Sequence, residues 1–263
     1  RRRARRTRQN ANTGTEMKAE VTVLLPVHNG AKWLPRAITS VLHQTFDYWK
    51  LLVLDDGSTD DSVRVAAEVM GKDCRCHILP FRHRGLTATL RDGVEAAWTP
   101  YLARLDADDW MTRDRLKKQM HAVEQEGYTI LGSSVEEHRP HVVQVHYPVP
   151  EADCRAAISG WRPRNPFAHS AVVLHRPDVL LVGNYDTRWK TCQDLALWIE
   201  LASLPCRRIG NLPETLTCRQ IHPGQVSRGW RRRWDQYRIV LEAKRNGVMP
   251  SLANKEEREW SRH

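Results

Sequence analysis

The chain has 263 residues, of which 41% are hydrophobic and 27% are charged. This mixture is typical of a globular protein and excludes an intrinsically disordered chain, and no apolar run approaches the ~20 residues of a membrane-spanning helix. The formal net charge is +10. Residues 1–16 hold six arginines against one glutamate, 6 − 1 = +5, and we expect them to be a disordered basic tail or an added extension.

The first half of the chain alternates predicted strands with predicted helices. Apolar β-branched runs predict strands at residues 21–26, 51–54, 77–80 and 101–105. Apolar positions at helical spacing predict helices at 31–45, 58–70, 86–98 and 113–126, the second capped by Ser58. This alternation favours an α/β fold, with a parallel sheet covered by helices on both faces.

After about residue 128 the alternation weakens. Strands are predicted at 129–135, 142–145 and 171–174, and helices at 152–159, 193–204 and 230–246. We expect one domain over 17–230, with a first half at 17–127 and a second at 128–230. A basic, helical C-terminal extension would follow at 231–263.

Carboxylates gather where two of the predicted strands end. Asp106-Ala107-Asp108-Asp109 closes one strand, and three carboxylates so close together repel one another unless a cation or solvent intervenes. Oxygen ligands suit Mg²⁺ or Mn²⁺. Asp55-Asp56 closes another strand and can present a carboxylate to the N–H of a pyrimidine base. Open α/β sheets bind ligands at this edge.

The motifs, taken in order, resemble the inverting family 2 glycosyltransferases. The resemblance rests on LLPVHNGAKWLPRAITSVLHQTF, DYWKLLVLDDGSTDDS, RGLTATLRDGVEAAW, YLARLDADDW and RLKKQ, and further on RNPFAHSAVVLHR, CQDLALWIELA and RQIHPGQVS. It runs from about residue 21 to about residue 228. It implies the GT-A fold, in which a Rossmann-like nucleotide-binding half with a mixed central sheet joins an acceptor-binding half.

The resemblance also implies roles for particular residues. Asp56 would contact the base, and Asp106 and Asp108 would hold the ribose and, through Mn²⁺ or Mg²⁺, the diphosphate. Asp194 would be the general base, and His222 would approach the metal beside Asp108. The remaining donor-binding residues implied are Pro26, Val27, His28, Asn29, Arg84, Gly85, Arg91 and Ala107.

Three positions depart from the family pattern and bear on which donor is used. His28 stands where tyrosine is usual, Gln193 where glutamate is usual, and Arg91 where asparagine is common. The expected enzyme is a hexosyltransferase of polysaccharide biosynthesis that uses a UDP-sugar and a glycan or lipid-linked acceptor. Asp194 begins a predicted helix, whose dipole favours negative charge there.

Two alternatives remain open on the residues alone. One is a nucleotidyltransferase-like enzyme acting on nucleotide sugars, although His28-Asn29-Gly30-Ala31 is a poor phosphate-binding loop. The other is a basic binding module, suggested by the arginines at 1–8 and 231–233. No aromatic-basic pattern supports nucleic acid as the partner, whereas a basic face suits an anionic membrane. We therefore expect a cytoplasmic protein with peripheral contact at the inner membrane face.

Overall fold

The computed structural model of the protein describes residues 21–159, 164–222 and 230–247. The strands are β1 (Val21–Val27), β2 (Trp49–Asp55), β3 (Cys76–Pro80), β4 (Tyr101–Arg104), β5 (Trp110–Met111), β6 (Tyr128–Arg139), β7 (Val142–His146), β8 (Val173–His175) and β9 (Arg208–Gln220). The α-helices are α1 (Leu34–Leu42), α2 (Ser62–Met70), α3 (Leu86–Ala96), α4 (Arg115–Glu126), α5 (Glu151–Ser159), α6 (Arg176–Leu181), α7 (Gln193–Ser203) and α8 (Trp230–Arg245). A single 3₁₀ turn, η1 (His169–Ala171), precedes β8.

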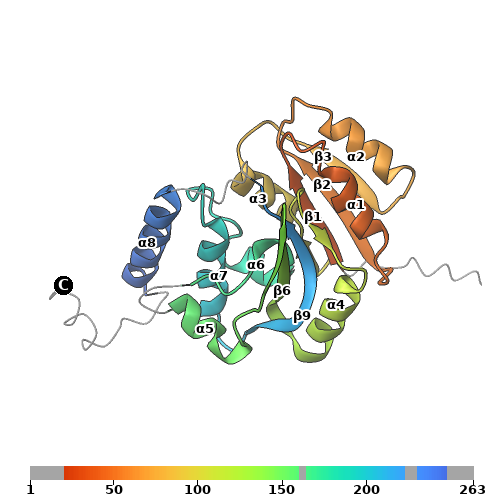
Figure 1. Ribbon diagram of the computed structural model, residues 1–263. Coiled ribbons are helices and arrows are strands. Elements are labelled where there is room, and N and C mark those ends of the chain that lie inside the picture. Colours follow the sequence, from red (N-terminus) through yellow and green to blue (C-terminus); the bar gives the residue numbers. More distant parts are fainter. Residues whose placement is uncertain (1–20, 160–163, 223–229, 248–263) are drawn as a thin grey trace, which may run out of the picture.

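These strands form one mixed sheet in the order β3-β2-β1-β4-β8-β6-β9-β5, with β7 paired to β6 (Figure 1). The strands β3, β2, β1 and β4 run parallel to one another, as the alternation predicted. β8 is antiparallel to both β4 and β6, whereas β9 is parallel to β6. The sheet is therefore Rossmann-like in the first half of the chain and mixed in the second.

Different helices cover the two faces of the sheet. Figure 1 shows α1, α2 and α4 together on one face. Successive side chains of a strand point to opposite faces. In β1, Val23 and Leu25 join a buried cluster with side chains of α1, α2 and α4. Leu24 joins a second cluster with side chains of α3, α5, α6, α7 and α8. Both cores hold the parallel strands rigidly, so the loops at their carboxyl ends have fixed starting points.

The longest strand of the second half, β9, was not predicted from the sequence. Pro213 and Glu214 interrupt its apolar pattern, and proline cannot donate to a ladder. The structure accommodates both residues in an irregularity of the β6–β9 ladder, where Ser133 pairs with Leu212 and the next residue, Ser134, pairs with Thr215. The strand thus continues past the interruption by means of a bulge. The short elements β5 and α6 were also missed.

Helix α8 agrees with the predicted C-terminal helix and packs onto the second half. Ile239, Val240 and Ala243 are buried in the cluster that includes α7, and Glu242 pairs with Arg188 at 2.7 Å. The predicted tail at 1–16 and the side chains of residues 231–233 lie outside the described residues.

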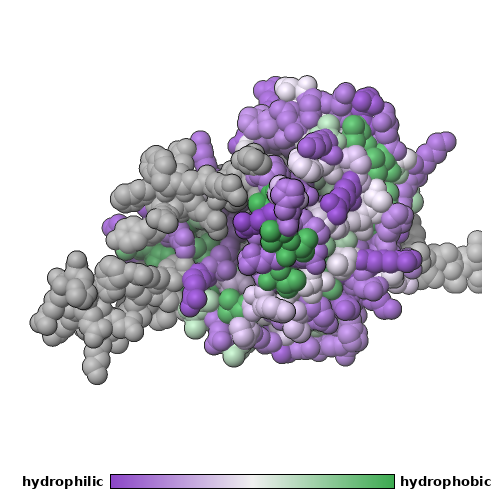
Figure 2. All heavy atoms as spheres, viewed as in Figure 1, coloured by the Kyte–Doolittle hydropathy of each residue, from purple (hydrophilic) through white to green (hydrophobic). Residues whose placement is uncertain are grey.

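Among the residues that the structure describes, no helix combines the length and apolarity needed to cross a bilayer. Figure 2 shows a mainly hydrophilic face in this view, on which hydrophobic side chains gather in small separate groups.

Candidate functional site

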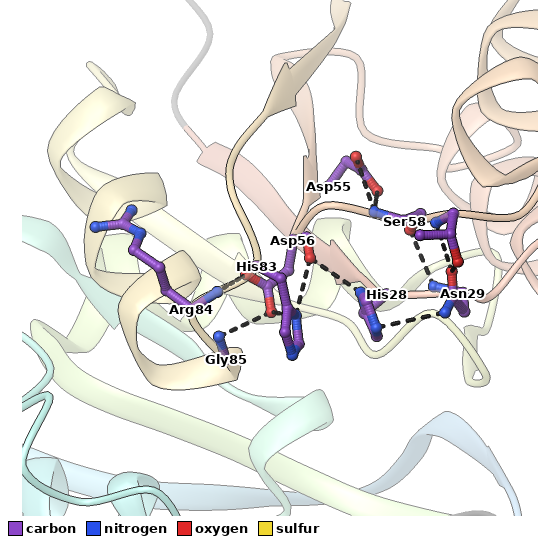
Figure 3. A network of polar contacts seen from close by, with 9 residues as sticks. His28, Asn29, Asp55, Asp56, Ser58, His83, Arg84 and Gly85 are labelled. Atoms are coloured by element: carbon purple, nitrogen blue, oxygen red, sulfur yellow. Dashed lines mark hydrogen bonds and ion pairs between the residues drawn. The ribbon is translucent and has the colours of Figure 1, made fainter.

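The Asp56 carboxylate organises the loops at the carboxyl ends of β1 and β2 (Figure 3). Asp56 is only 4% exposed. Its Oδ1 accepts a hydrogen bond from the main-chain N–H of Arg84 at 2.8 Å, and its Oδ2 accepts one from Gly85 at 2.9 Å. Gly85 adopts a φ of +91°, which favours glycine, directly before α3. The predicted base-contacting carboxylate therefore also fixes the start of α3.

Two histidine rings lie against Asp56. His28 and His83 stack with ring centroids 4.1 Å apart and an interplanar angle of 26°. The Nδ1 atoms of His28 and His83 lie 2.9 and 3.1 Å from the Asp56 main-chain oxygen, so each Nδ1–H can donate to it. His83 Nδ1 is also 3.0 Å from Asp56 Oδ2. The sequence analysis missed His83, whose only signal was its position just before the Arg84-Gly85 motif.

Asn29 locks this loop to the one that follows β2. Its Oδ1 accepts from the N–H groups of Thr59 at 2.8 Å and Asp60 at 3.3 Å, and its own N–H donates to Ser58 Oγ at 2.9 Å. Helix α2 consequently begins at Ser62, and the prediction of a helix capped by Ser58 was wrong. The N–H groups that would have opened such a helix are held by Asn29 and by the Asp55 carboxylate instead.

Other predicted donor-binding residues lie deeper or turn away. Pro26 and Val27 are buried within β1 and lie beneath the loop. The Arg84 guanidinium pairs with Asp92. The Arg91 guanidinium binds the main-chain oxygens of Gly183 at 2.9 Å and Tyr185 at 3.1 Å. The structure thus brings His28, Asn29, Asp56 and the Arg84 and Gly85 backbone together, whereas the Arg91 side chain is directed to a different loop.

The Asp106–Asp109 segment follows β4, beside the β1 loop. Oxygens of Asp106, Asp108 and Asp109 lie within 4.8 Å of one another. His222 Nε2 is 3.0 Å from Asp108 Oδ2, and the His222 ring stacks on Trp33 at 4.9 Å. Ala107 lies close to Gly30, where an added Cβ would stand 3.7 Å from the Ala107 Cβ. The carboxylate oxygens of this group fit Mn²⁺ or Mg²⁺.

Charge in this segment is distributed unevenly. Burial raises the pKa of Asp106, but Arg104 and His169 outweigh that effect and hold this pKa below its usual range. Burial, followed by the charges of Asp106 and Asp108, raises the pKa of Asp109 well above its usual range. Asp106 is therefore held as an anion, while Asp109 favours its protonated form and accepts a hydrogen bond from the Gln220 N–H at 3.1 Å.

Arg104 is a buried cation that the sequence analysis did not single out. Its side chain is 2% exposed and pairs with Asp106 at 2.5 Å through one terminal nitrogen. Its Nε and its other terminal nitrogen are buried without a hydrogen-bond partner. Burying unsatisfied donors is costly. Arg115 supports the same strand by donating to the Arg104 main-chain oxygen at 2.9 Å.

Asp194 lies in the first turn of α7, far from Asp106 in sequence. Both carboxylates lie close enough to His169 to affect its pKa. Asn165 donates to Asp194 Oδ2 at 2.5 Å. His169 Nε2 and the Tyr185 hydroxyl are 2.8 Å apart. Burial and Arg104 lower the pKa of His169 to about 4, against the opposing charges of Asp194 and Asp106. The charges of both carboxylates therefore act on His169, although one follows β4 and the other lies in α7.

A parallel β3-β2-β1-β4 unit joined through the antiparallel β8 to a second half, with carboxylates at the strand ends, defines the GT-A fold. The chain belongs to glycosyl transferase family 2, whose model matches residues 22–173, more than half of its length.

The chain is similar to several curated glycosyltransferases. It is 26% identical to the Erwinia amylovora amylovoran biosynthesis glycosyltransferase AmsE, covering 87% of this chain and 88% of that protein. It is also 26% identical to the putative glycosyltransferase EpsE of Bacillus subtilis, covering 68% of this chain and 66% of EpsE. An uncharacterized glycosyltransferase of Rickettsia conorii is 26% identical over 78% of this chain, but the chain spans only 33% of that relative.

The fold is also similar to that of S. aureus TarS. The structure of TarS 1-349 in complex with UDP-GlcNAc matches with a TM-score of 0.69 at 15% identity, covering 85% of this chain and 66% of the TarS 1-349 chain. At this level of identity the similarity concerns the fold.

Proposed function

We propose that the protein is an inverting glycosyltransferase that moves a sugar from a UDP-sugar to a hydroxyl group of a glycan or lipid-linked acceptor. The observation that carries the proposal is the carboxylate cluster of Asp106, Asp108 and Asp109 beside His222, in a chain that matches glycosyl transferase family 2. Asp194, in the first turn of α7, supplies a carboxylate outside this cluster. The complex of TarS with UDP-GlcNAc and the amylovoran-synthesising relative support the donor and acceptor classes.

The base of the donor would bind beside the stacked His28 and His83 rings. A uracil ring offers one N–H donor, and the Asp56 carboxylate retains acceptor capacity beyond its two main-chain hydrogen bonds. The aromatic faces of the two imidazoles suit stacking on a base. Uracil fits this arrangement better than guanine, because guanine presents an N1–H and an amino group that together need both carboxylate oxygens, and both Asp56 oxygens already accept main-chain hydrogen bonds.

Asp106, Asp108 and His222 would hold Mn²⁺ or Mg²⁺ next to the donor diphosphate. When bound, such a cation stabilises the negative charge that develops on the leaving nucleoside diphosphate. Arg104 adds a permanent positive charge behind Asp106 and keeps that carboxylate ionised. Trp33 holds the His222 ring in place by stacking.

Asp194 would remove the proton from the acceptor hydroxyl. The hydroxyl oxygen forms a bond to the anomeric carbon, the bond from that carbon to the diphosphate oxygen breaks, and the proton passes to Asp194. A single in-line displacement inverts the anomeric centre. The Asn165 amide holds one Asp194 oxygen, leaving the other oriented for the acceptor.

A product assay tests this function against the nucleotidyltransferase alternative. The protein is incubated with Mn²⁺, a panel of UDP- and GDP-sugars and a glycan acceptor mixture, and the released nucleotide is identified chromatographically. Acceptor-dependent release of a nucleoside diphosphate is expected, and Asp194→Asn should slow it by ~10²–10⁴-fold. In a parallel incubation with a nucleoside triphosphate and a sugar 1-phosphate, release of pyrophosphate together with formation of a nucleotide sugar would show the alternative chemistry instead.

A further inference from the structure

A second group of metal-ligating side chains lies outside the donor site, on the paired strands β6 and β9. Glu136 and His138 are two residues apart on β6 and therefore share a face. Cys218 of β9 is the register partner of Glu136. One ligand atom from each residue lies within 4.8 Å of the other two. The sheet thus presents an oxygen, a nitrogen and a sulfur to one point.

The contacts inside this group leave it incompletely satisfied. His138 Nε2 lies 2.5 Å from Glu136 Oε1, yet this nitrogen is buried and has no hydrogen bond of acceptable geometry. Cys218 is 8% exposed. The group therefore combines a buried thiol with a buried imidazole nitrogen that lacks a hydrogen bond.

We propose that Glu136, His138 and Cys218 bind one divalent transition-metal ion, for which Zn²⁺ is the best match. Thiolate, imidazole and carboxylate are the ligands that zinc takes in proteins, with bonds of about 2.0–2.3 Å. Tetrahedral geometry at those bond lengths separates the ligand atoms by roughly 3.3–3.8 Å. Side-chain adjustments of about 1 Å bring the group to that spacing. The Glu136 and His138 side chains are 30% and 27% exposed, which leaves an entry path and room for a water as the fourth ligand.

The position of this site connects it to the Asp106–Asp109 segment. Cys218 pairs with Trp110 of β5, two residues beyond Asp108. The His138 main-chain oxygen accepts a hydrogen bond of 2.9 Å from the N–H of Ile221, the residue before His222. A metal ion here would link β6 to β9. This link would lie next to Trp110 and Ile221, the neighbours in sequence of Asp108 and His222, which contact each other. We assign it a positioning role, separate from transfer chemistry.

Cobalt spectroscopy tests the proposal on the full chain. After chelator treatment, Co²⁺ is added to the wild type, Cys218→Ser, Cys154→Ser and Asp108→Ala. The wild type should show a thiolate-to-cobalt charge-transfer band with intense tetrahedral d–d bands. Cys218→Ser should lose the band, and the buried-cysteine control Cys154→Ser should keep it. Asp108→Ala should also keep the thiolate-to-cobalt band. That result would show that this site is separate from the one formed by Asp106, Asp108 and His222, and it does not depend on transferase activity.

Zinc affinity gives a second, independent measurement. Competition against a chromophoric chelator should show one tight Zn²⁺ site in the wild type, weakened at least ~100-fold in Cys218→Ser, since loss of an outer partner alone costs ~10–100-fold. His138→Gln should weaken it as well, which keeps the test valid if Cys218→Ser does not fold by circular dichroism. Absence of the thiolate band in Co²⁺-treated wild type, or its survival in folded Cys218→Ser, would overturn the proposal.

Discussion

Asn165 donates a hydrogen bond of 2.5 Å from its side-chain amide to the Asp194 carboxylate at the start of α7. Replacement of Asp194 by asparagine keeps the shape of this contact but removes the proton acceptor. Loss of a general base costs ~10²–10⁴-fold in rate, so Asp194→Asn should lower kcat by that amount while the donor Kd stays nearly unchanged.

The measurement is kcat from nucleoside-diphosphate release, with donor Kd from calorimetry. Glu200→Gln, an isosteric change on the same helix, is the matched control and should retain activity. A decrease in kcat of less than about tenfold, below the range for a lost base, would show that Asp194 is not the base. A parallel collapse of donor affinity would assign it to binding.

The Asp108–His222 contact of 3.0 Å leads to a prediction about metal dependence. Asp108→Ala should abolish transfer and weaken Mn²⁺-dependent binding of UDP, because the cation loses a charged oxygen ligand. Asp114→Ala, which removes a carboxylate before α4, serves as control. Calorimetry of UDP with and without Mn²⁺ gives the comparison. Full wild-type activity in excess EDTA would contradict the prediction.

The stacked His28 and His83 rings lead to a prediction about which nucleotide base binds beside them. UDP should bind more tightly than GDP, and His83→Ala should weaken UDP binding by about fivefold or more, since base–aromatic stacking contributes ~1–3 kcal/mol. His77→Ala, on the edge strand β3, is the control. Tighter binding of GDP in calorimetry, or unchanged UDP affinity in His83→Ala, would reject the assignment of this pocket to uracil.

His169 predicts a pH dependence of stability. Its pKa of about 4 in the folded protein lies below the value of about 6.5 for an unperturbed histidine. The unfolded chain therefore binds more protons between these values, and stability falls as the pH decreases from about 6.5 to about 4. Urea midpoints measured across this window should fall less steeply in His169→Gln than in the wild type. The exposed His43→Gln should behave like the wild type, and identical slopes in all three proteins would refute the effect.

The parallel half of the fold could be predicted because its strands are continuous apolar runs between amphipathic helices. Val21–Val27 and Trp49–Asp55 are buried on both faces and need no contact from afar to be recognised. Asp56, Asp106 and Asp108 were predicted as site residues for a related reason, since they lie just after the ends of such strands. Their spacing along the chain already places them at one edge of the sheet.

The remaining parts depend on tertiary contacts that leave no local pattern. Strand β9 continues past Pro213 through a bulge in its pairing with β6, and the loop before α2 is held by hydrogen bonds to Asn29, which lies far away in sequence. Arg104 looks like an ordinary strand residue until burial and Asp106 give it a role. His83 becomes a candidate site residue only through its stacking on His28, which lies far away in sequence.

The pairing of β5 with β9 has a consequence for how the protein folds. Trp110 meets Cys218 only after nearly all of the described chain has been synthesised, and parallel β6–β9 pairing requires a similarly distant closure. Non-local pairing of this kind slows folding. Until β9 has been synthesised, the edge of β6 that pairs with it has free backbone N–H and C=O groups. Such an edge can pair with strands of other chains and cause aggregation. The first half of the chain should therefore gain its finished edge, where we propose the metal site, only at the end of folding. Fragments that end before β9 should aggregate rather than fold as a smaller enzyme.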